Sequence, residues 1–165
     1  MSDVKKVEKA RDALLDKART MTIATLSNEE DGEVETGFSP FARLEDGSFI
    51  IYTSRLSAHV RALLSDQPAQ FTIIQDEAEA SNIWARHRLK FTATITEIAR
   101  EDEQFEHYCA LIGARSGPTM GLIQQFSDFH LLHITPQEGV LVTGFAAAYK
   151  VEGPHFIITE HLSKT

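Results

Sequence analysis

The stretch IYTSRLSAHVRALLSDQPAQFTII, residues 51–74, decides the fold of this chain of 165 residues. It starts as a strand, changes to helical spacing after Ser57 and returns to an apolar strand. Ser57 is a residue type that caps helices. Val60, Leu63 and Leu64 then give the short helix a single apolar face. The chain is therefore expected to turn a sharp corner where the first strand meets the helix.

On both sides of this stretch, apolar and polar residues alternate as they do in strands that form hairpins. The pattern predicts strands over residues 21–27, 34–44, 49–54, 69–75, 88–99, 129–137 and 139–145, and the segments 146–153 and 154–162 complete the chain. Amphipathic spacing predicts helices over residues 4–19, 57–67, 100–117 and 118–128. This order is typical of an antiparallel barrel with helices at its ends, and not of an alternating α/β sheet.

The predicted fold class is mainly β (α+β), an antiparallel barrel of about six to eight strands with flanking helices. The first three strands are expected to form a meander, in which Pro40 makes the second strand an edge or bulged strand. A turn over residues 136–138 is expected to join two separate strands. We expect a single domain, residues 1–165, with an N-terminal helix over 1–20 and a barrel with inserted helices over 21–165.

The net charge, the apolar segments and the cysteine content of the chain argue against some classes of binding partner and location. The formal net charge of −8 argues against a nucleic-acid partner and gives no support for binding an anionic membrane. No segment is apolar and long enough to span a membrane, and the N-terminus lacks a signal core. The one cysteine, Cys109, cannot form an internal disulfide, which predicts a cytoplasmic protein.

The corner after the first strand of the opening stretch is a candidate anion site. Backbone N–H groups in the first turn of a helix favour an anion, and Arg55 and Arg61 lie close in sequence. His59 would be unfavourable as a cation beside that positive helix end, so we expect it to be neutral. A surface helix with incidental charges is the alternative interpretation. The residues of this corner do not by themselves identify which anion would bind there.

Other motifs that carry chemistry are lacking in the sequence. There is no dinucleotide-binding or phosphate-binding glycine motif, no zinc-finger spacing and no hydrolase nucleophile elbow. His130 and His133 are three residues apart within a predicted strand, so they should face opposite sides of the sheet. A metal site shared by these two histidines is therefore not expected.

The order of elements, with the blocks TIATLS, GFSPF and the opening stretch, resembles the FMN-binding split barrels related to pyridoxamine 5′-phosphate oxidase. The blocks IIQDEAEASNIWARHRLKF, FSDFHLLHI and GVLVTGFAAAY resemble more specifically the haem-utilisation branch, the HutZ/HugZ type. These blocks cover most of the chain in the same order.

The resemblance implies a homodimer with two ligand sites in clefts between the subunits. It implies haem in place of flavin, oxidative opening of haem for iron release in some members, and an electron-donating reductase as partner. Two alternatives stay open: an FMN-dependent oxidoreductase of the wider class, and a non-catalytic protein that stores or transfers haem.

The resemblance also implies roles for individual residues. Asp128 matches an aspartate that hydrogen-bonds the axial histidine, which fixes the tautomer of that ring. Arg88 matches an arginine of the haem pocket, suited to pairing with a propionate. Trp84 could stack on a flat ligand or merely cover one end of the barrel. In the family the axial histidine lies in a tail beyond the segment TEHLSKT, so His161 is the candidate iron ligand here and His155 is its alternative.

Arg55, Ser57, His59 and Arg61 complete the set of candidate ligand-binding residues. In flavin-binding relatives the corner that they form holds the flavin phosphate, and in the haem branch it lines the cleft of the dimer.

Overall fold

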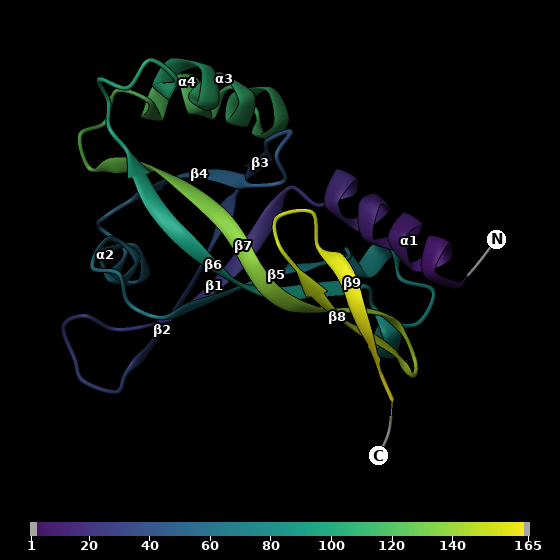
Figure 1. Cartoon of the computed structure of the whole chain (residues 1–165). Coiled ribbons are helices and arrows are strands. Elements are labelled where there is room, and N and C mark those ends of the chain that lie inside the picture. The colour runs from purple at the N-terminus through teal and green to yellow at the C-terminus, as the bar shows by residue number, and fades with distance from the viewer. Residues whose placement is uncertain (1–2, 164–165) are drawn as a thin grey trace.

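A computed structural model describes residues 3–163 of the chain as one curved sheet with helices packed around it (Figure 1). The helices are α1 (Asp3–Lys17), α2 (Ala58–Leu64), α3 (Phe105–Ser116) and α4 (Thr119–Ile123), with short 3-10 turns η1 (Glu77–Glu79) and η2 (Ile83–Ala85). The strands are β1 (Thr20–Leu26), β2 (Val34–Pro40), β3 (Ala42–Arg43), β4 (Phe49–Ser54), β5 (Ala69–Ile74), β6 (Arg88–Ile98), β7 (Phe129–Gly144), β8 (Ala147–Glu152) and β9 (Ile157–Leu162).

The sheet confirms the predicted fold class. Its strands follow the order β2-β1-β5-β6-β7-β4-β3, with β8 and β9 added beside β7, and every pair is antiparallel. The sheet has 9 strands, slightly more than expected, because residues 34–44 form two strands and the last two segments form a hairpin.

The predicted meander of the first three strands is wrong. β2 pairs with β1 only and is therefore an edge strand, as Pro40 indicated, but β4 pairs with β3 and β7 instead of β2. The chain leaves the β1–β2 hairpin at Phe41, whose side chain is fully buried in the core. Burial of this ring directs the chain into β3 and across to the other edge of the sheet.

The predicted turn over residues 136–138 is also wrong, because β7 runs without interruption through 16 residues. Pro136 lies opposite Ala93, beside a shift of register between Phe91 and Ala93 of β6. A β-bulge already interrupts the ladder there, so a proline that lacks an N–H group is tolerated. The strand bends at this point where we expected it to end.

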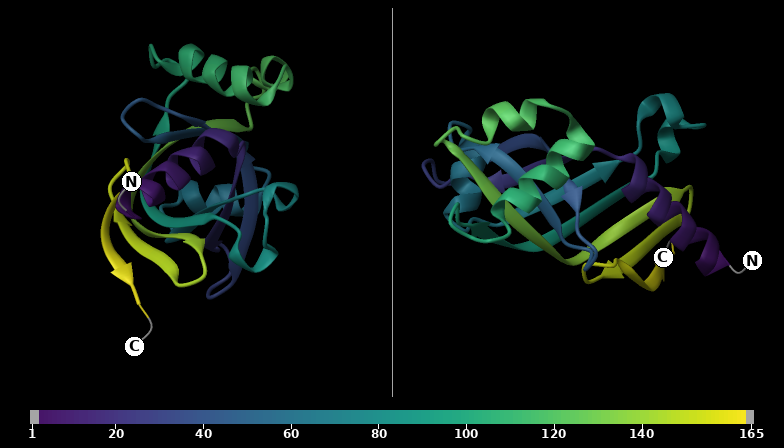
Figure 2. Two further views of the ribbon diagram at one scale, coloured as in Figure 1. Left: turned by 90° about the vertical axis from the view of Figure 1, so that its right-hand side faces the viewer. Right: turned by 90° about the horizontal axis from the view of Figure 1, so that it is seen from above.

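Two apolar clusters hold the elements in place. The larger one fills the concave side of the sheet with β-branched and aromatic side chains and includes Val7, Leu14 and Leu15 of α1. The smaller one lies between the other side of the sheet and the pair α3–α4, where Tyr52 contacts Phe105. Figure 2 shows α3 and α4 as a separate layer above the sheet. Strand β4 thus faces both clusters, which fixes the position of its last residue, Ser54.

Helix α3 starts at Phe105, later than its amphipathic pattern predicted. The Asp102 carboxylate accepts a hydrogen bond from the Gln104 N–H, which closes a turn ahead of the helix. Arg100, two residues before Asp102, therefore lies in the loop between β6 and α3, close to the start of β7. In residues 3–163, no helix is long and apolar enough to cross a membrane.

Candidate functional site

Asp128 lies at the corner between β4 and α2. Its carboxylate Oδ2 accepts a hydrogen bond of 2.5 Å from the Ser54 hydroxyl, and its carbonyl accepts one of 2.9 Å from the Arg55 N–H. The Ser54 oxygen accepts a further bond from the Leu56 N–H at 3.1 Å. Within the described chain, no hydrogen bond occupies the other carboxylate oxygen, Oδ1. The fold therefore joins Asp128 to a corner that lies more than 70 residues away in sequence.

Arg61 is not available as a free cation at this corner. Its Nε donates to Glu29 at 2.5 Å, and its Nη1 donates to the Arg55 and Leu56 carbonyls at 2.9 and 3.0 Å. The hydrogen bond and the charge of Glu29 raise the pKa of Arg61, and Arg61 in turn lowers the pKa of Glu29. Arg61 thus holds the connection between β4 and α2, and Arg55 is an exposed cation at the same corner.

His59 is buried beneath the corner. Only 9% of the residue is exposed, and its Nε2 has no hydrogen-bond partner among residues 3–163. Burial lowers the pKa of His59, while the charge of Glu35 opposes this shift. These features agree with the expected neutral imidazole. The His59 ring lies against Gly37 of β2. A Cβ atom at position 37 would overlap this ring.

Ser57 occupies the predicted N-cap position of α2, but its side chain makes no capping hydrogen bond. Its carbonyl accepts the first bonds of the helix, from Val60 and Arg61. The expected hydroxyl cap is therefore absent at this position. Ser57 is exposed, so its hydroxyl faces solvent at the rim of the corner.

A second group of candidate residues lies elsewhere on the chain. Arg88 is the first residue of β6, pairs with Val142 of β7 and donates its Nη1 to the Arg86 carbonyl at 3.0 Å. Trp84 of η2 is 80% exposed, so it does not cover the end of the barrel. An exposed indole is suited to stacking on a flat ligand, and an arginine is suited to pairing with an anionic group.

His161 belongs to this second group. It lies on β9 opposite Tyr149, with the two rings stacked at 4.8 Å, and its Nε2 is 2.8 Å from the Ala146 carbonyl oxygen. Because a carbonyl only accepts hydrogen bonds, Nε2 is the donor in this contact, and in the neutral form of the ring Nδ1 carries the lone pair. His155 is exposed in the turn between β8 and β9. The last two residues of TEHLSKT lie outside the described residues.

The two groups lie at opposite ends of the β6–β7 ladder. Arg88 pairs with Val142 at one end, and Ile98 pairs with Leu131, close to Asp128, at the other. The 11 residues of β6 span roughly 30 Å at the usual rise of a strand. Figure 1 shows the same separation, with α2 on the left and β8 and β9 on the right. One protomer therefore does not bring all the candidate residues together.

The remaining histidines and the cysteine have local partners. His130 Nδ1 lies 2.6 Å from a Glu97 carboxylate oxygen, and His133 Nε2 lies 2.8 Å from the Ser48 hydroxyl. His130 and His133 thus have different partners, which agrees with the expectation that they face opposite sides of the sheet. In residues 3–163, no group of three potential ligands is placed to hold a metal ion. Cys109 is fully buried, and burial raises its pKa to about 11, so its thiol stays protonated.

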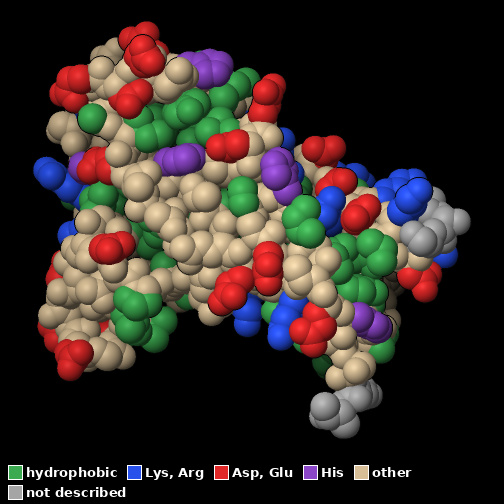
Figure 3. Space-filling view, in the orientation of Figure 1, with side chains coloured by type: hydrophobic (Ala, Val, Ile, Leu, Met, Phe, Trp, Pro, Cys, Tyr) green, Lys and Arg blue, Asp and Glu red, His purple; other side chains and the backbone are tan. Residues whose placement is uncertain are grey.

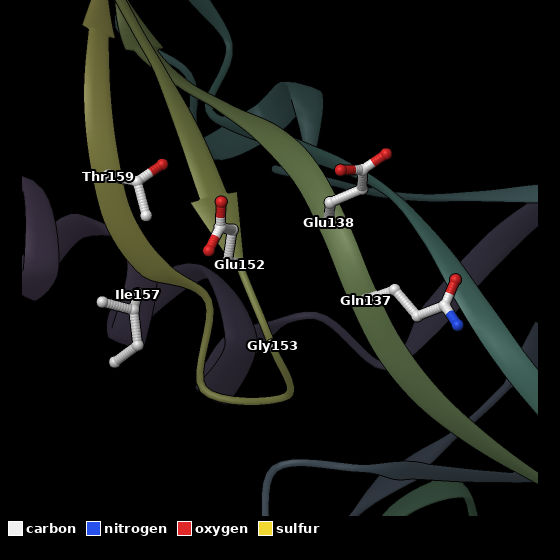
Figure 4. A pocket seen from close by; sticks show the side chains of 6 residues that line it. All are labelled: Gln137, Glu138, Glu152, Gly153, Ile157 and Thr159. Carbon is white, nitrogen blue, oxygen red and sulfur yellow. The ribbon is translucent and has the colours of Figure 1, made fainter.

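A surface depression on β7, β8 and β9 offers different chemistry (Figure 4). It has a volume of about 590 Å³, and Glu138 and Glu152 stand opposite each other on neighbouring strands within it. Gln137, Gly153, Ile157 and Thr159 complete its lining, which includes no basic side chain. Figure 3 shows acidic side chains spread over this side of the molecule, with the basic ones in small groups. The depression is therefore poorly suited to an anionic ligand.

Sequence reasoning missed Ser54 and Arg100, which hold the loop that carries Asp128. Their partners are distant in sequence and include backbone carbonyls, which no residue pattern identifies. The alternation of β4 and β6 predicts which face a side chain takes, but it does not predict such pairings across the fold.

Comparison with known proteins adds family relationships to this geometry. Residues 7–143 match the family described as pyridoxamine 5′-phosphate oxidase. The protein named heme oxygenase HutZ, from Vibrio cholerae, is 30% identical over 146 residues, which cover 88% of this chain and 81% of HutZ.

Solved structures show the same fold. A crystal structure of HutZ, described there as a heme storage protein from Vibrio cholerae, has a TM-score of 0.71 at 26% identity and covers 79% of this chain and 90% of that chain. Campylobacter jejuni ChuZ has a TM-score of 0.84 at 23% identity, over 99% of this chain and 66% of ChuZ. A heme binding protein from Mycobacterium smegmatis has a TM-score of 0.76 at 21% identity, over 94% and 60% of the two chains.

Proposed function

Since the chain belongs to the pyridoxamine 5′-phosphate oxidase family, in the branch that contains HutZ, we propose that it binds haem for haem utilisation. The ligand site lies between two copies of the chain, in a homodimer with two equivalent sites. The single unpaired cysteine supports a cytoplasmic location for this activity.

The separation of the candidate residues into two groups carries this proposal. We name them the corner group (Arg55, Ser57, His59, Arg61 and Asp128) and the strand-end group (Trp84, Arg88 and His161). They lie at opposite ends of the β6–β7 ladder, too far apart to contact one ligand. In a two-fold dimer, the corner group of one copy meets the strand-end group of the other, and the symmetry makes two such sites.

Exposed apolar side chains in or near the two groups support the same arrangement. Leu56, within the corner, is 78% exposed, and Trp84 is 80% exposed. Phe38, on the edge strand β2, is 65% exposed. Large apolar side chains of this kind are favourable when a partner or a flat ligand covers them.

The residues present fit haem in donor chemistry. His161 has a free lone pair on Nδ1, Arg88 and Arg55 are cations for propionates, and Trp84 presents an open aromatic face. When bound, haem supplies its iron for ligand binding or oxygen chemistry, while the protein supplies orientation and electrostatics. In the proposed dimer, Asp128 Oδ1 of the second copy would accept a hydrogen bond from His161 Nε2–H in place of the Ala146 carbonyl. A carboxylate partner raises the basicity of a ligating imidazole.

FMN fits the corner less well than haem does. A flavin phosphate needs the cationic side chains of the corner, but Glu29 already neutralises Arg61, and the Ser57 hydroxyl does not order the first turn of α2. We therefore assign haem, and use FMN as the competing ligand in the test.

The proposal is tested by titrating the purified protein with hemin and, in parallel, with FMN while recording visible spectra. We expect a Soret band that saturates at one haem per protomer, and no saturable change with FMN. His161→Ala should weaken haem binding by about tenfold or more, since an iron ligand is lost. The matched variant His155→Ala, in the neighbouring turn, should bind like the wild type.

A saturable flavin spectrum without haem binding would contradict the proposal. Incubation of the haem complex with ascorbate under air then distinguishes the two descriptions given to HutZ, heme oxygenase and heme storage protein. Loss of the Soret band indicates oxidative degradation, for which ascorbate replaces an electron-donating reductase, and a persistent band indicates storage or transfer.

A further inference from the structure

We propose that Arg100 is the positioning residue that fixes Asp128 for its role in the ligand site. This inference rests on the proposed function, because it concerns the same carboxylate. Arg100 stands in the loop between β6 and α3, and its guanidinium donates to three backbone carbonyls of the segment before and at the start of β7. These carbonyls belong to Gln124 at 2.9 Å, Phe126 at 2.5 Å and Phe129 at 3.1 Å.

The three carbonyls lie on both sides of Asp128 in the chain. A single planar guanidinium with several donors in a fixed arrangement holds them at set distances from one another. The segment 124–129 connects α4 to β7 without a regular hydrogen-bond ladder of its own. The hydrogen bonds from Arg100 therefore hold this segment in place where no regular ladder does.

Neighbouring side chains fix Arg100 in turn. Its guanidinium lies 5.4 Å from the centre of the Phe105 ring, and its Nη2 is 3.2 Å from the Tyr52 hydroxyl. Tyr52 donates to the Gln124 carbonyl at 2.8 Å and stacks on Phe129 at 5.2 Å. The arginine is thus connected to β4, α3 and the 124–129 segment together.

The position of the segment 124–129 affects the corner directly, because hydrogen bonds join the two. The Asp128 carbonyl accepts the Arg55 N–H, and its Oδ2 accepts the Ser54 hydroxyl, which also binds the Leu56 N–H. A shift of the segment would move Asp128 Oδ1 and loosen these bonds. Arg100 is largely exposed, so its chief effect is expected on the placement of Asp128 and only secondarily on global stability.

The test uses Arg100→Met, which keeps an unbranched apolar side chain but removes the guanidinium and its donors. Arg115→Met is the matched control, because Arg115 also donates to backbone carbonyls, those of Leu15, Asp16 and Ala18, and lies over an aromatic ring, Phe41. Its acceptors are at the end of α1, away from Asp128.

The first readout is amide hydrogen exchange in haem-free protein. Arg100→Met should speed exchange at the Arg55 and Leu56 amides about tenfold, while Arg115→Met leaves them unchanged. Arg100→Lys, which keeps the cation and three donors, should give an intermediate rate and serves if the methionine variant does not fold. Unchanged exchange at both amides in these Arg100 variants would overturn the inference, whatever the haem result.

The second readout is haem affinity with Asp128→Asn as reference. Arg100→Met should weaken binding about tenfold and shift the Soret band as Asp128→Asn does, and the double variant should be no weaker than Asp128→Asn alone. If Asp128→Asn binds haem normally, the proposed role of Asp128 fails. If Asp128→Asn weakens binding and Arg100→Met does not, the proposed role stands and the Arg100 inference is wrong.

Discussion

Arg61 shows how a residue's partner decides what it can do. Its neighbours in sequence suggested a free cation for an anionic ligand, but Glu29, 32 residues away, neutralises it. Asp128 shows the opposite case, because the fold brings it to the corner between β4 and α2 and leaves one carboxylate oxygen unbonded within residues 3–163. Residue types, spacing and family resemblance select candidate side chains, and long-range contacts decide which of them are available.

Burial of His59 predicts how stability depends on pH. Because burial lowers the pKa of His59 in the folded state, the unfolded chain binds a proton that the folded chain excludes once the pH falls below about 6.5. The stability contributed by the neutral ring is therefore complete above that pH and declines below it. His59→Gln should show a shallower loss of stability between pH 7 and pH 5 than the wild type, measured by urea unfolding.

The exposed His107 on α3 provides the control, since His107→Gln should keep the wild-type slope. Equal slopes for the wild type and His59→Gln would show that burial of this ring does not contribute to the pH dependence.

At the scale of elements, the sequence predicted most strands and helices but not all their connections. Alternation predicted β1, β5 and β6 closely, because each buries one face in the concave cluster, and a continuous apolar run predicted β4, which is buried on both faces. It failed at residues 136–138, where Pro136 suggested a turn. The register gives β7 one extra residue between Pro136 and Gly139, a bulge that accommodates this proline, and the sequence pattern of such a bulge is the same as that of a turn.

Gly139 lies beside this bulge, where β6 and β7 approach each other closely. A Cβ atom there would overlap the Lys90 carbonyl oxygen and lie 2.9 Å from the Phe91 Cβ. Gly139→Ala should therefore destabilise the fold by about 1–3 kcal/mol through overpacking. At Gly144 of the same strand, a Cβ would meet only Ala147 Cβ at 3.8 Å, an ordinary contact.

Chemical denaturation at one protein concentration compares the two variants, because association would shift the apparent stability. If Gly139→Ala is as stable as Gly144→Ala, the two strands do not approach as closely as described.

At the scale of the whole molecule, the net charge of −8 and the site are compatible, because the cations of the site are local. The sequence indicated the fold class and the site residues through resemblance. It could not indicate that these residues lie in two groups, since only the register of β6 with β7 separates Arg88 from Asp128. The proposed site shared by two copies rests on that separation.

The most direct test of a shared site mixes two defective variants, Asp128→Ala and His161→Ala, unfolded and refolded together so that subunits exchange. Each variant alone should bind haem weakly. In a mixed dimer, one site carries both substitutions and the other carries neither, so we expect tight haem binding to return at one site per mixed dimer. If mixing restores no tight binding although mixed dimers form, the two residues do not act across the subunit interface, and the proposed shared site is wrong.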